Sequence, residues 1–480
     1  MSLFGILNTA SAALLNTQTQ IGTVSNNIGN SNTPNYVARQ AITIESDPAA
    51  GGTDTVLINR AINTTLQQEY LQQSTTSANQ SYVNSIYTQL EQLDGSAAGT
   101  PSLPAAMQQF TAAFQALQTT PSAATAQQGV ITAGQNLVQT VQGIASGVQA
   151  LFTQVGQQTQ SDVKTLNTTL ASIASLNSQI AGAKGAGLST AALQDTLDAA
   201  VQTVSTLVPV QASFANDGTV QLSTPQGVQL VSGTVPASFA FNAATDTIYN
   251  ASDPAQNSLN AAFAGGQIGA EISTLDTSAA GVASQAPGSA PLQKVLDQLN
   301  SFADQFWAPN PPGPMTAFQA AYNNAAPTNT GELAADFFTI ANFGASPSTD
   351  AFGFQVNPAL LNGTATVKQA AASPVVGQLL ATNNSFSAGG VTAANASYTG
   401  IAQALANNQT QRAQLAQSDQ QASSAALTTT QSTYQNATGV NVNQELTQLI
   451  VLQNSYGASA KVISIVEQLF STLDNATSAH

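Results

Sequence analysis

The sequence predicts a mainly α-helical protein with terminal coiled-coil helices from both chain ends, a helical-bundle layer and an inserted β-containing outer domain. Apolar residues recur every seven positions at both ends of the 480-residue chain, as in coiled-coil helices. Between residues 208 and 249 the apolar period changes to two, which indicates short strands. Because the helical pattern resumes afterwards, we expect the chain to leave a helical base, build an outer domain and return.

The first predicted helix covers residues 3–28. Its two heptad rows are Leu7, Leu14, Ile21 and Ile28, and Leu3, Ala10, Thr17 and Val24. We expect the helix to end within residues 26–34, since Asn and Gly weaken helices and Pro34 disfavours helical geometry at Thr33.

The middle of the chain is expected to hold a second helical layer and then the strands. Predicted helices cover residues 82–93, 107–117, 141–155, 163–173, 193–204, 292–306 and 401–432. A β-hairpin is predicted over residues 210–222, with its turn at Asn216, Asp217 and Gly218, and further short strands over 228–249. The predicted domains are 1–50 with 436–480, 51–207 with 385–435, and the outer domain 208–384.

The last predicted helix begins near residue 442 and mirrors the first. Its rows are Val442, Leu449, Tyr456, Ile463 and Phe470, and Leu452, Val466 and Leu473. Since a lone helix with a narrow apolar stripe is marginal in water, we expect both ends to be disordered in the monomer. Such stripes are more often ordinary core, but their position at the two chain ends favours contacts between subunits. The predicted assembly interface is Leu3, Leu7, Leu14, Ile21, Val24, Ile28, Leu449, Leu452, Tyr456, Ile463, Val466 and Phe470.

Composition excludes several classes of partner. Charged residues are 6% of the chain and the net charge is −15, which gives no electrostatic attraction to nucleic acid or to anionic membranes. We therefore expect neither as a partner. No apolar run approaches a membrane span of about 20 residues, and the N-terminus lacks the pattern of a cleaved signal peptide. Few charged groups also predict little dependence of stability on pH between 7 and 4.

Catalytic side chains are scarce. The chain has no Cys, and its one His is His480, which excludes thiolate metal sites and His-based triads. Glu332 and Asp336 are one helical turn apart and could serve a glycosidase, but a solvated helix face is the favoured interpretation. We expect no enzyme activity, no catalytic residue, no metal and no cofactor.

The two ends resemble the flagellar axial family of rod, hook and hook-associated proteins. The N-terminal segment Val24-Ser-Asn-Asn-Ile-Gly-Asn-Ser-Asn-Thr-Pro-Asn-Tyr36 is similar to the family's motif, with motif residues Asn26, Asn27, Asn30, Asn32, Thr33, Pro34 and Tyr36. The C-terminal segment 442–463 looks like the family's second signature. Arg39-Gln40, the helix ending near Ile180, and Asp336-Phe337-Phe338 are similar to the hook-associated members in particular.

The resemblance implies a structural subunit at the junction of hook and filament, with a hook or distal rod subunit as the alternative. A carbohydrate-active secreted enzyme is the alternative of another class. The resemblance also implies an extracellular location reached through the flagellar type III apparatus, without a cleaved signal peptide. The implied partners are the hook protein, hook-associated protein 3, further copies of the chain in a ring, and an export chaperone.

Overall fold

The chain folds into two compact units, each assembled from separated stretches of sequence. The computed structural model describes residues 3–33, 36–44, 55–96, 102–215, 217–275, 290–308, 315–333, 335–341 and 350–478. Unit 1 combines Met1–Thr75, Leu166–Ala237 and Ser424–His480, and unit 2 combines Thr76–Thr165 and Ser238–Ser423. The predicted class, mainly α with an inserted β-containing region, is confirmed. The three-domain division stays a prediction.

Long helices dominate both units. Those with residues in both units are α2 (Thr64–Glu91), α4 (Ala124–Gly185) and α12 (Tyr398–Thr438). The helices of unit 1 alone are α1 (Leu3–Gly29), α5 (Ala191–Leu207) and α13 (Val442–Ser478). The predicted terminal helices are therefore confirmed. The helical patterns at residues 141–155 and 163–173 belong to one long helix, α4.

Unit 1 also holds two antiparallel sheets. In the first, β1 (Arg39–Ile44) pairs with β2 (Thr55–Arg60), with Arg39 opposite Arg60. The second has the order β3-β4-β5-β6, with strands Gln211–Phe214, Val220–Ser223, Gln229–Ser232 and Val235–Pro236. The predicted hairpin is β3–β4, and Gly218 in its turn has φ +86°, which favours glycine. Asn216 of that turn lies outside the described residues.

Asn177 of α4 ties the four-stranded sheet to the helix within unit 1. Its amide nitrogen donates to the carbonyls of Val220 and Gly233 at 2.8 and 2.7 Å. Its amide oxygen accepts from the Val220 N–H at 2.9 Å. Since the side chain is fully buried, these bonds satisfy groups that would be costly to leave unpaired.

Unit 2 packs short helices and two-stranded sheets around an aromatic core. Its helices are α3 (Leu103–Thr119), α6 (Gly266–Leu275), α7 (Pro291–Asp304), α8 (Ala317–Asn323), α9 (Asp350–Gly353), α10 (Pro358–Leu361) and α11 (Ala372–Leu380). Its strands are β7 (Phe239–Asn242), β8 (Thr247–Asn250), β9 (Phe338–Ile340), β10 (Phe354–Val356), β11 (Asn384–Ala388) and β12 (Val391–Ala396). Single turns of other helix types are η2 (Gln92–Ser96), η3 (Asn260–Phe263) and η4 (Gln369–Ala371).

Phe306 lies at the centre of that aromatic core. Its ring centroid is 5.3 Å from those of Phe318 and Phe338 and 5.0 Å from that of Tyr398. All four side chains are buried. Aromatic contacts of this kind stabilise a core beyond the effect of area alone, so unit 2 does not need disulfides to be rigid.

Candidate assembly site at the chain ends

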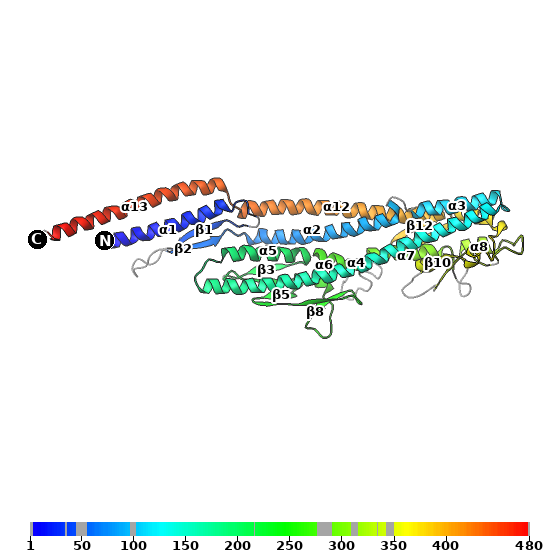
Figure 1. Cartoon of the computed structure of the whole chain (residues 1–480), viewed down its shortest axis with the longest axis horizontal. Helices are drawn as coiled ribbons and strands as arrows, with labels where there is room; N and C mark the ends of the chain where they lie inside the picture. Colours follow the sequence, from blue (N-terminus) through cyan, green and yellow to red (C-terminus); the bar gives the residue numbers. More distant parts are fainter. Residues whose placement is uncertain are drawn as a thin grey trace. The chain divides into compact units, whose positions relative to one another are not determined.

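The two ends of the chain lie side by side within unit 1. α1 and α13 are antiparallel, so that the start of one lies next to the end of the other (Figure 1). The rings of Phe4 and Phe470 meet edge to face, with centroids 6.5 Å apart. In the structure each narrow stripe finds a partner in the same chain, and the expected disorder of both ends in the monomer stays a prediction.

The predicted interface residues are buried to different depths in this helix pair. Val24, Leu452 and Val466 are buried within the single chain. Half-buried positions are Leu3, Leu7, Leu14, Ile21, Ile28, Leu449, Ile463 and Phe470. Tyr456 is 38% exposed. The role of these residues in contacts between subunits stays a prediction. Because α1 and α13 already bury part of their apolar surface within one chain, less of it is available to a neighbouring subunit.

A second apolar face on α13 is exposed, and it was missed at the sequence level. We define this outer stripe as Val451, Val462, Ile465 and Leu469, which are 58%, 40%, 50% and 50% exposed. Their spacing of three, four and eleven residues places them on one side of the helix. The helical spacing of these four apolar residues is visible in the sequence, but the heptad rows predict only the opposite face of the helix as apolar.

This exposure changes the membrane expectation in one respect. The helical region Tyr398–Asn475 contains an 18-residue stretch with a mean hydropathy of 1.2, of which 11% is buried. By length and composition such a stretch could cross a membrane. This was not predicted from the sequence, because the apolar residues of the stretch are interrupted by polar ones. One helix of this kind is weak evidence, since a helix that packs against other protein chains has the same composition.

Asn27 of α1 explains why the polar motif follows the first helix. Its side chain is fully buried, and its amide nitrogen donates to the Arg39 carbonyl at 2.8 Å and to the Glu445 carboxylate at 2.9 Å. Its amide oxygen accepts from the Tyr36 hydroxyl at 2.9 Å and the Arg39 N–H at 3.0 Å. One amide thus joins α1, the segment leading into β1, and the first turn of α13.

The other motif residues shape the end of α1. The Asn30 amide donates to the Asn26 carbonyl at 2.9 Å, and the Thr33 hydroxyl donates to the Asn30 side chain at 3.2 Å. Asn32 is exposed beside them. These side chains hold the backbone in a polar turn after the helix. Pro34 lies outside the described residues.

A cluster of four charged side chains fixes the β1–β2 hairpin to α5. Arg60 contacts both Asp195, at 2.9 Å, and Asp198, and Arg39 contacts Asp195 at 3.2 Å. Burial raises the pKa of the Asp198 carboxyl, and the charge of Arg60 opposes that rise. The sequence offered no signal for this cluster, since the arginines and aspartates are far apart along the chain.

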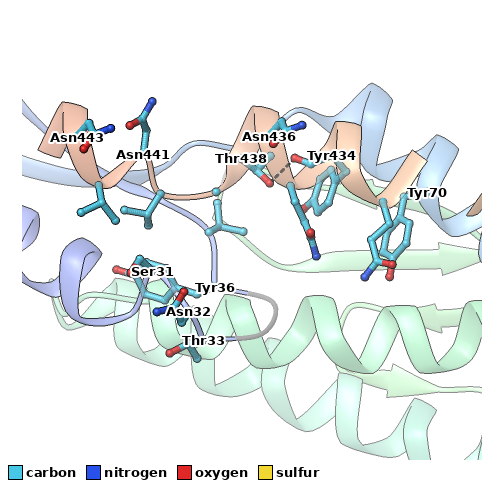
Figure 2. A pocket seen from close by; sticks show the side chains of 16 residues that line it. Ser31, Asn32, Thr33, Tyr36, Tyr70, Tyr434, Asn436, Thr438, Asn441 and Asn443 are labelled. Carbon is cyan, nitrogen blue, oxygen red and sulfur yellow. Dashed lines mark hydrogen bonds between the residues drawn. The ribbon is translucent and has the colours of Figure 1, made fainter. Parts of the chain in front are cut away.

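A pocket of about 600 Å³ lies between the end of the motif and the turn from α12 to α13 (Figure 2). Tyr70 and Tyr434 stack at its edge, with ring centroids 5.7 Å apart and planes 9° apart. Figure 2 labels Ser31, Asn32, Thr33, Tyr36, Tyr70, Tyr434, Asn436, Thr438, Asn441 and Asn443. None of the residues that line the pocket carries a charge, so it presents neutral hydrogen-bonding groups.

Glu332 and Asp336 of unit 2 differ from the sequence-based expectation. The segment that holds them is not helical, so they do not form a solvated helix face. The Glu332 carboxylate accepts from the Thr328 N–H at 2.7 Å and from the Gln369 N–H at 3.1 Å. Asp336 accepts from the Trp307 indole N–H at 2.8 Å. Both carboxylates accept hydrogen bonds that connect separate loops. The i, i+4 spacing alone could not predict these bonds.

Across the described residues, no three His, Cys, Asp or Glu side chains gather as metal ligands. His480 lies outside the described part of the chain.

Two flagellar family models match parts of the chain. Residues 87–308 match the model of the flagellar hook-associated protein FlgK helical domain, and residues 431–476 match the flagellar basal body rod FlgEFG protein C-terminal model. Over these two segments the chain is similar to flagellar hook-associated and rod proteins. The resemblance seen in the sequence is thereby confirmed. The second match covers most of α13, and therefore the outer stripe and Glu445.

Curated relatives similar to this chain carry the name flagellar hook-associated protein 1. The protein from Salmonella typhimurium is 28% identical over 243 residues, which is 49% of this chain and 44% of the relative. The protein from Bacillus subtilis is 25% identical over 243 residues, covering 47% of each. The chain thus spans a little under half the length of these relatives.

A solved structure, the flagellar hook junction protein FlgK from Burkholderia pseudomallei, is also similar. The match has a TM-score of 0.45 and 22% identity, and covers 57% of this chain and 47% of the other.

Proposed function

We propose that this chain is a structural, non-enzymatic subunit of the bacterial flagellum that joins the hook to the filament. The family match over residues 87–308 carries the proposal. The relatives' name, hook-associated protein 1, supports the hook side of the assignment. The pairing of α1 with α13 supports a role in assembly, because it brings the two segments that resemble the axial family's motifs into one structural element.

The proposed assembly surface is the outer stripe of α13. The heptad rows hold α1 and α13 together within one subunit, and the outer stripe contacts the next copy in a ring. Its four side chains are about half exposed. Covering them contributes roughly 4 kcal/mol per contact before entropy is subtracted, at about 1.5–3 kcal/mol for each fully buried apolar side chain.

The proposed partners follow from this position in the flagellum. They are the hook protein on one side, hook-associated protein 3 on the filament side, and further copies of this chain. We also propose export through the flagellar type III apparatus with the help of a chaperone, and an extracellular location.

A deletion strain tests the proposal. If the chain joins hook to filament, cells lacking it carry hooks without filaments and release flagellin into the medium. A hook or distal rod subunit would give a different result, because cells would then lack hooks altogether. Complementation with the full chain restores filaments in the first case. Filaments of normal number and length in the deletion strain would overturn the proposal.

A further inference from the structure

Two carboxyl groups of unit 2 share one buried amide. Glu271 of α6 is fully buried and Asp162 of α4 is 8% exposed. The amide nitrogen of Gln267 donates to Asp162 Oδ2 at 2.7 Å and to Glu271 Oε1 at 3.2 Å. The amide of Gln158 also donates to Asp162 Oδ2, at 3.0 Å. A single nitrogen within reach of both carboxyls places the two acids side by side.

Among the described residues, the groups that face this pair carry no positive charge. Besides the amides of Gln267 and Gln158, they are the phenol of Tyr82 from α2 and the hydroxyl of Thr159 from α4. Two bare carboxylates in such a site would repel one another and lack compensation for lost hydration. A proton on Glu271, donated to Asp162, removes one charge and supplies a hydrogen bond. Burial first, and then the bond to Asp162 and its charge, raise the pKa of Glu271 to about 9.

Asp304, at the end of α7, is a second acid of this kind. Its Oδ1 atom is buried and has no hydrogen-bond partner in the described part of the chain. It faces Asp350 of α9, which is 4% exposed. Burial, and then the charge of Asp350, raise the pKa of Asp304 to about 7.

We propose that the Glu271–Asp162 pair, together with Asp304, makes unit 2 a pH-responsive element that is most stable in acid and loses stability as the pH rises. The basis is geometric: acids are buried against acids on α4, α6, α7 and α9. The bases Lys294 and Arg412 lie near one another and not beside these acids. Burial and then the charge of Arg412 lower the pKa of Lys294.

The direction of the effect follows from proton linkage. The unfolded chain ionises Glu271 near 4.5, and the folded chain ionises it near 9. Below pH 4.5 both states hold the proton and the stability is complete. As the pH rises between these values, only the folded state keeps the proton, so stability falls until the folded group ionises. For Asp304 the corresponding window runs from 3.8 to about 7.

Composition alone predicted little dependence on pH, because it counts charges and cannot see their surroundings. One exposed group of unit 2 acts in the opposite direction. The N–H groups of Asn257 and Ala255 lower the pKa of Asp253, so its contribution is lost only at pH values below its ordinary 3.8. Between pH 5 and pH 8 the buried acids therefore determine the direction in which the stability of unit 2 changes with pH.

The test is thermal unfolding of the full chain at pH 5 and pH 8, compared with the double variant Glu271→Gln, Asp304→Asn. Unmodified chain is expected to melt about 5 °C or more higher at pH 5. The double variant is expected to lose most of that difference by gaining stability at pH 8. Asp419→Asn is the matched control, since it removes an exposed carboxylate from the same unit and is expected to keep the full difference.

Isotope-edited infrared spectroscopy gives a readout independent of stability. With carbon-13-labelled glutamate, a protonated carboxyl band from glutamate is expected at pH 7 in the unmodified chain, and its loss is expected in the single variant Glu271→Gln. The label separates this band from that of Asp304, which is partly protonated at the same pH. This measurement still applies if the double variant does not fold. Equal melting at both pH values, higher melting at pH 8, a full pH difference in a folded double variant, or no protonated band at pH 7 would each overturn the proposal.

Discussion

Asn27 of α1 and Glu445 of α13 are 418 residues apart in the sequence and are joined by a hydrogen bond of 2.9 Å. The same amide holds the segment that leads into β1, through Tyr36 and Arg39. The bond therefore connects the two chain ends at the point where the terminal helices meet the rest of unit 1. It gives the polar motif a structural purpose: Asn at this position can donate twice and accept twice, which Asp or Ala cannot.

Replacing Asn27 with Ala is expected to destabilise unit 1 by about 2–4 kcal/mol, because it leaves several buried polar groups without partners. Chemical denaturation of the full chain measures the change. Asn26→Ala is the control, since the neighbouring Asn26 side chain is exposed and its backbone carbonyl, which binds Asn30, is retained. Equal effects of both substitutions would contradict the role given to Asn27.

On the outer stripe, Val462→Asp and Ile465→Asp are expected to leave the monomer folded and to abolish filament attachment. Both side chains are largely exposed in the single chain, so a charge there is costly only after a neighbour covers it. Circular dichroism measures the fold, and motility in a complemented deletion strain measures assembly. Ser464→Asp is the control, because Ser464 is exposed on the far side of the same helix.

Two outcomes are informative about the heptad rows. Ile463→Asp places a charge on the side of α13 that packs on α1, so it is expected to loosen the helix pair as well as to block assembly. If Val462→Asp and Ile465→Asp swim normally while Ile463→Asp does not, the outer stripe is not the surface between subunits. The interface would then lie on the heptad rows, as the sequence alone predicted.

Local patterns predicted the elements well where one period continued without interruption. The terminal helices and the β3–β4 hairpin follow directly from their spacing. The hairpin β1–β2 was missed because ten residues, 45–54, separate its strands in place of a tight turn. α4 was predicted as separate segments, although its glycines do not interrupt it. At one of them, Gly147, a side chain would meet Leu93 at 2.5 Å, which indicates close packing instead of a helix break.

The candidate site was predictable in outline and not in its contacts. The motif around Asn27 was recognisable, but its partner Glu445 could not be found from spacing, since only the folded chain brings them together. The charged cluster of Arg60, Asp195 and Asp198 could not be predicted for the same reason, since only folding brings Arg60 to the two aspartates. Glu332 shows the opposite error: a helical spacing suggested a helix, and tertiary hydrogen bonds to Thr328 and Gln369 determine the local structure instead.

Arg60→Met is expected to destabilise unit 1 by about 3 kcal/mol at neutral pH, since it leaves Asp195 and Asp198 as buried carboxylates without their shared cation. The defect is expected to shrink as the pH falls. Burial already raises the pKa of Asp198, and without Arg60 that carboxyl takes up a proton more readily. Denaturation at pH 5 and pH 8 measures both effects.

Arg39→Met serves as the control for that experiment. The Arg39 side chain is more exposed than that of Arg60, 19% against 4%, and it contacts only Asp195 of the two acids. Its loss is expected to cost about 1 kcal/mol. A larger loss for Arg39→Met than for Arg60→Met would show that the hairpin depends on the outer ion pair and not on the buried one.

Truncation of the chain after Gly439 is expected to make α1 sensitive to protease while the rest of the chain stays resistant. α1 packs on α13 and has a narrow apolar stripe, so without α13 its burial is too small to offset the entropy of ordering the backbone, about 1–2 kcal/mol per residue. Limited proteolysis followed by mass spectrometry locates the cleavage sites. In the full chain, cuts within Leu3–Gly29 are expected to be slow.

A second variant separates the loss of the helix pair from the loss of chain length. Leu452→Asp with Val466→Asp keeps every residue but places two charges on the buried side of α13. It is expected to expose α1 to protease as the truncation does, because a buried charge without a partner costs several kcal/mol. Rapid cleavage of α1 in the unmodified chain would mean that the ends are not paired in the monomer and order only against neighbouring subunits.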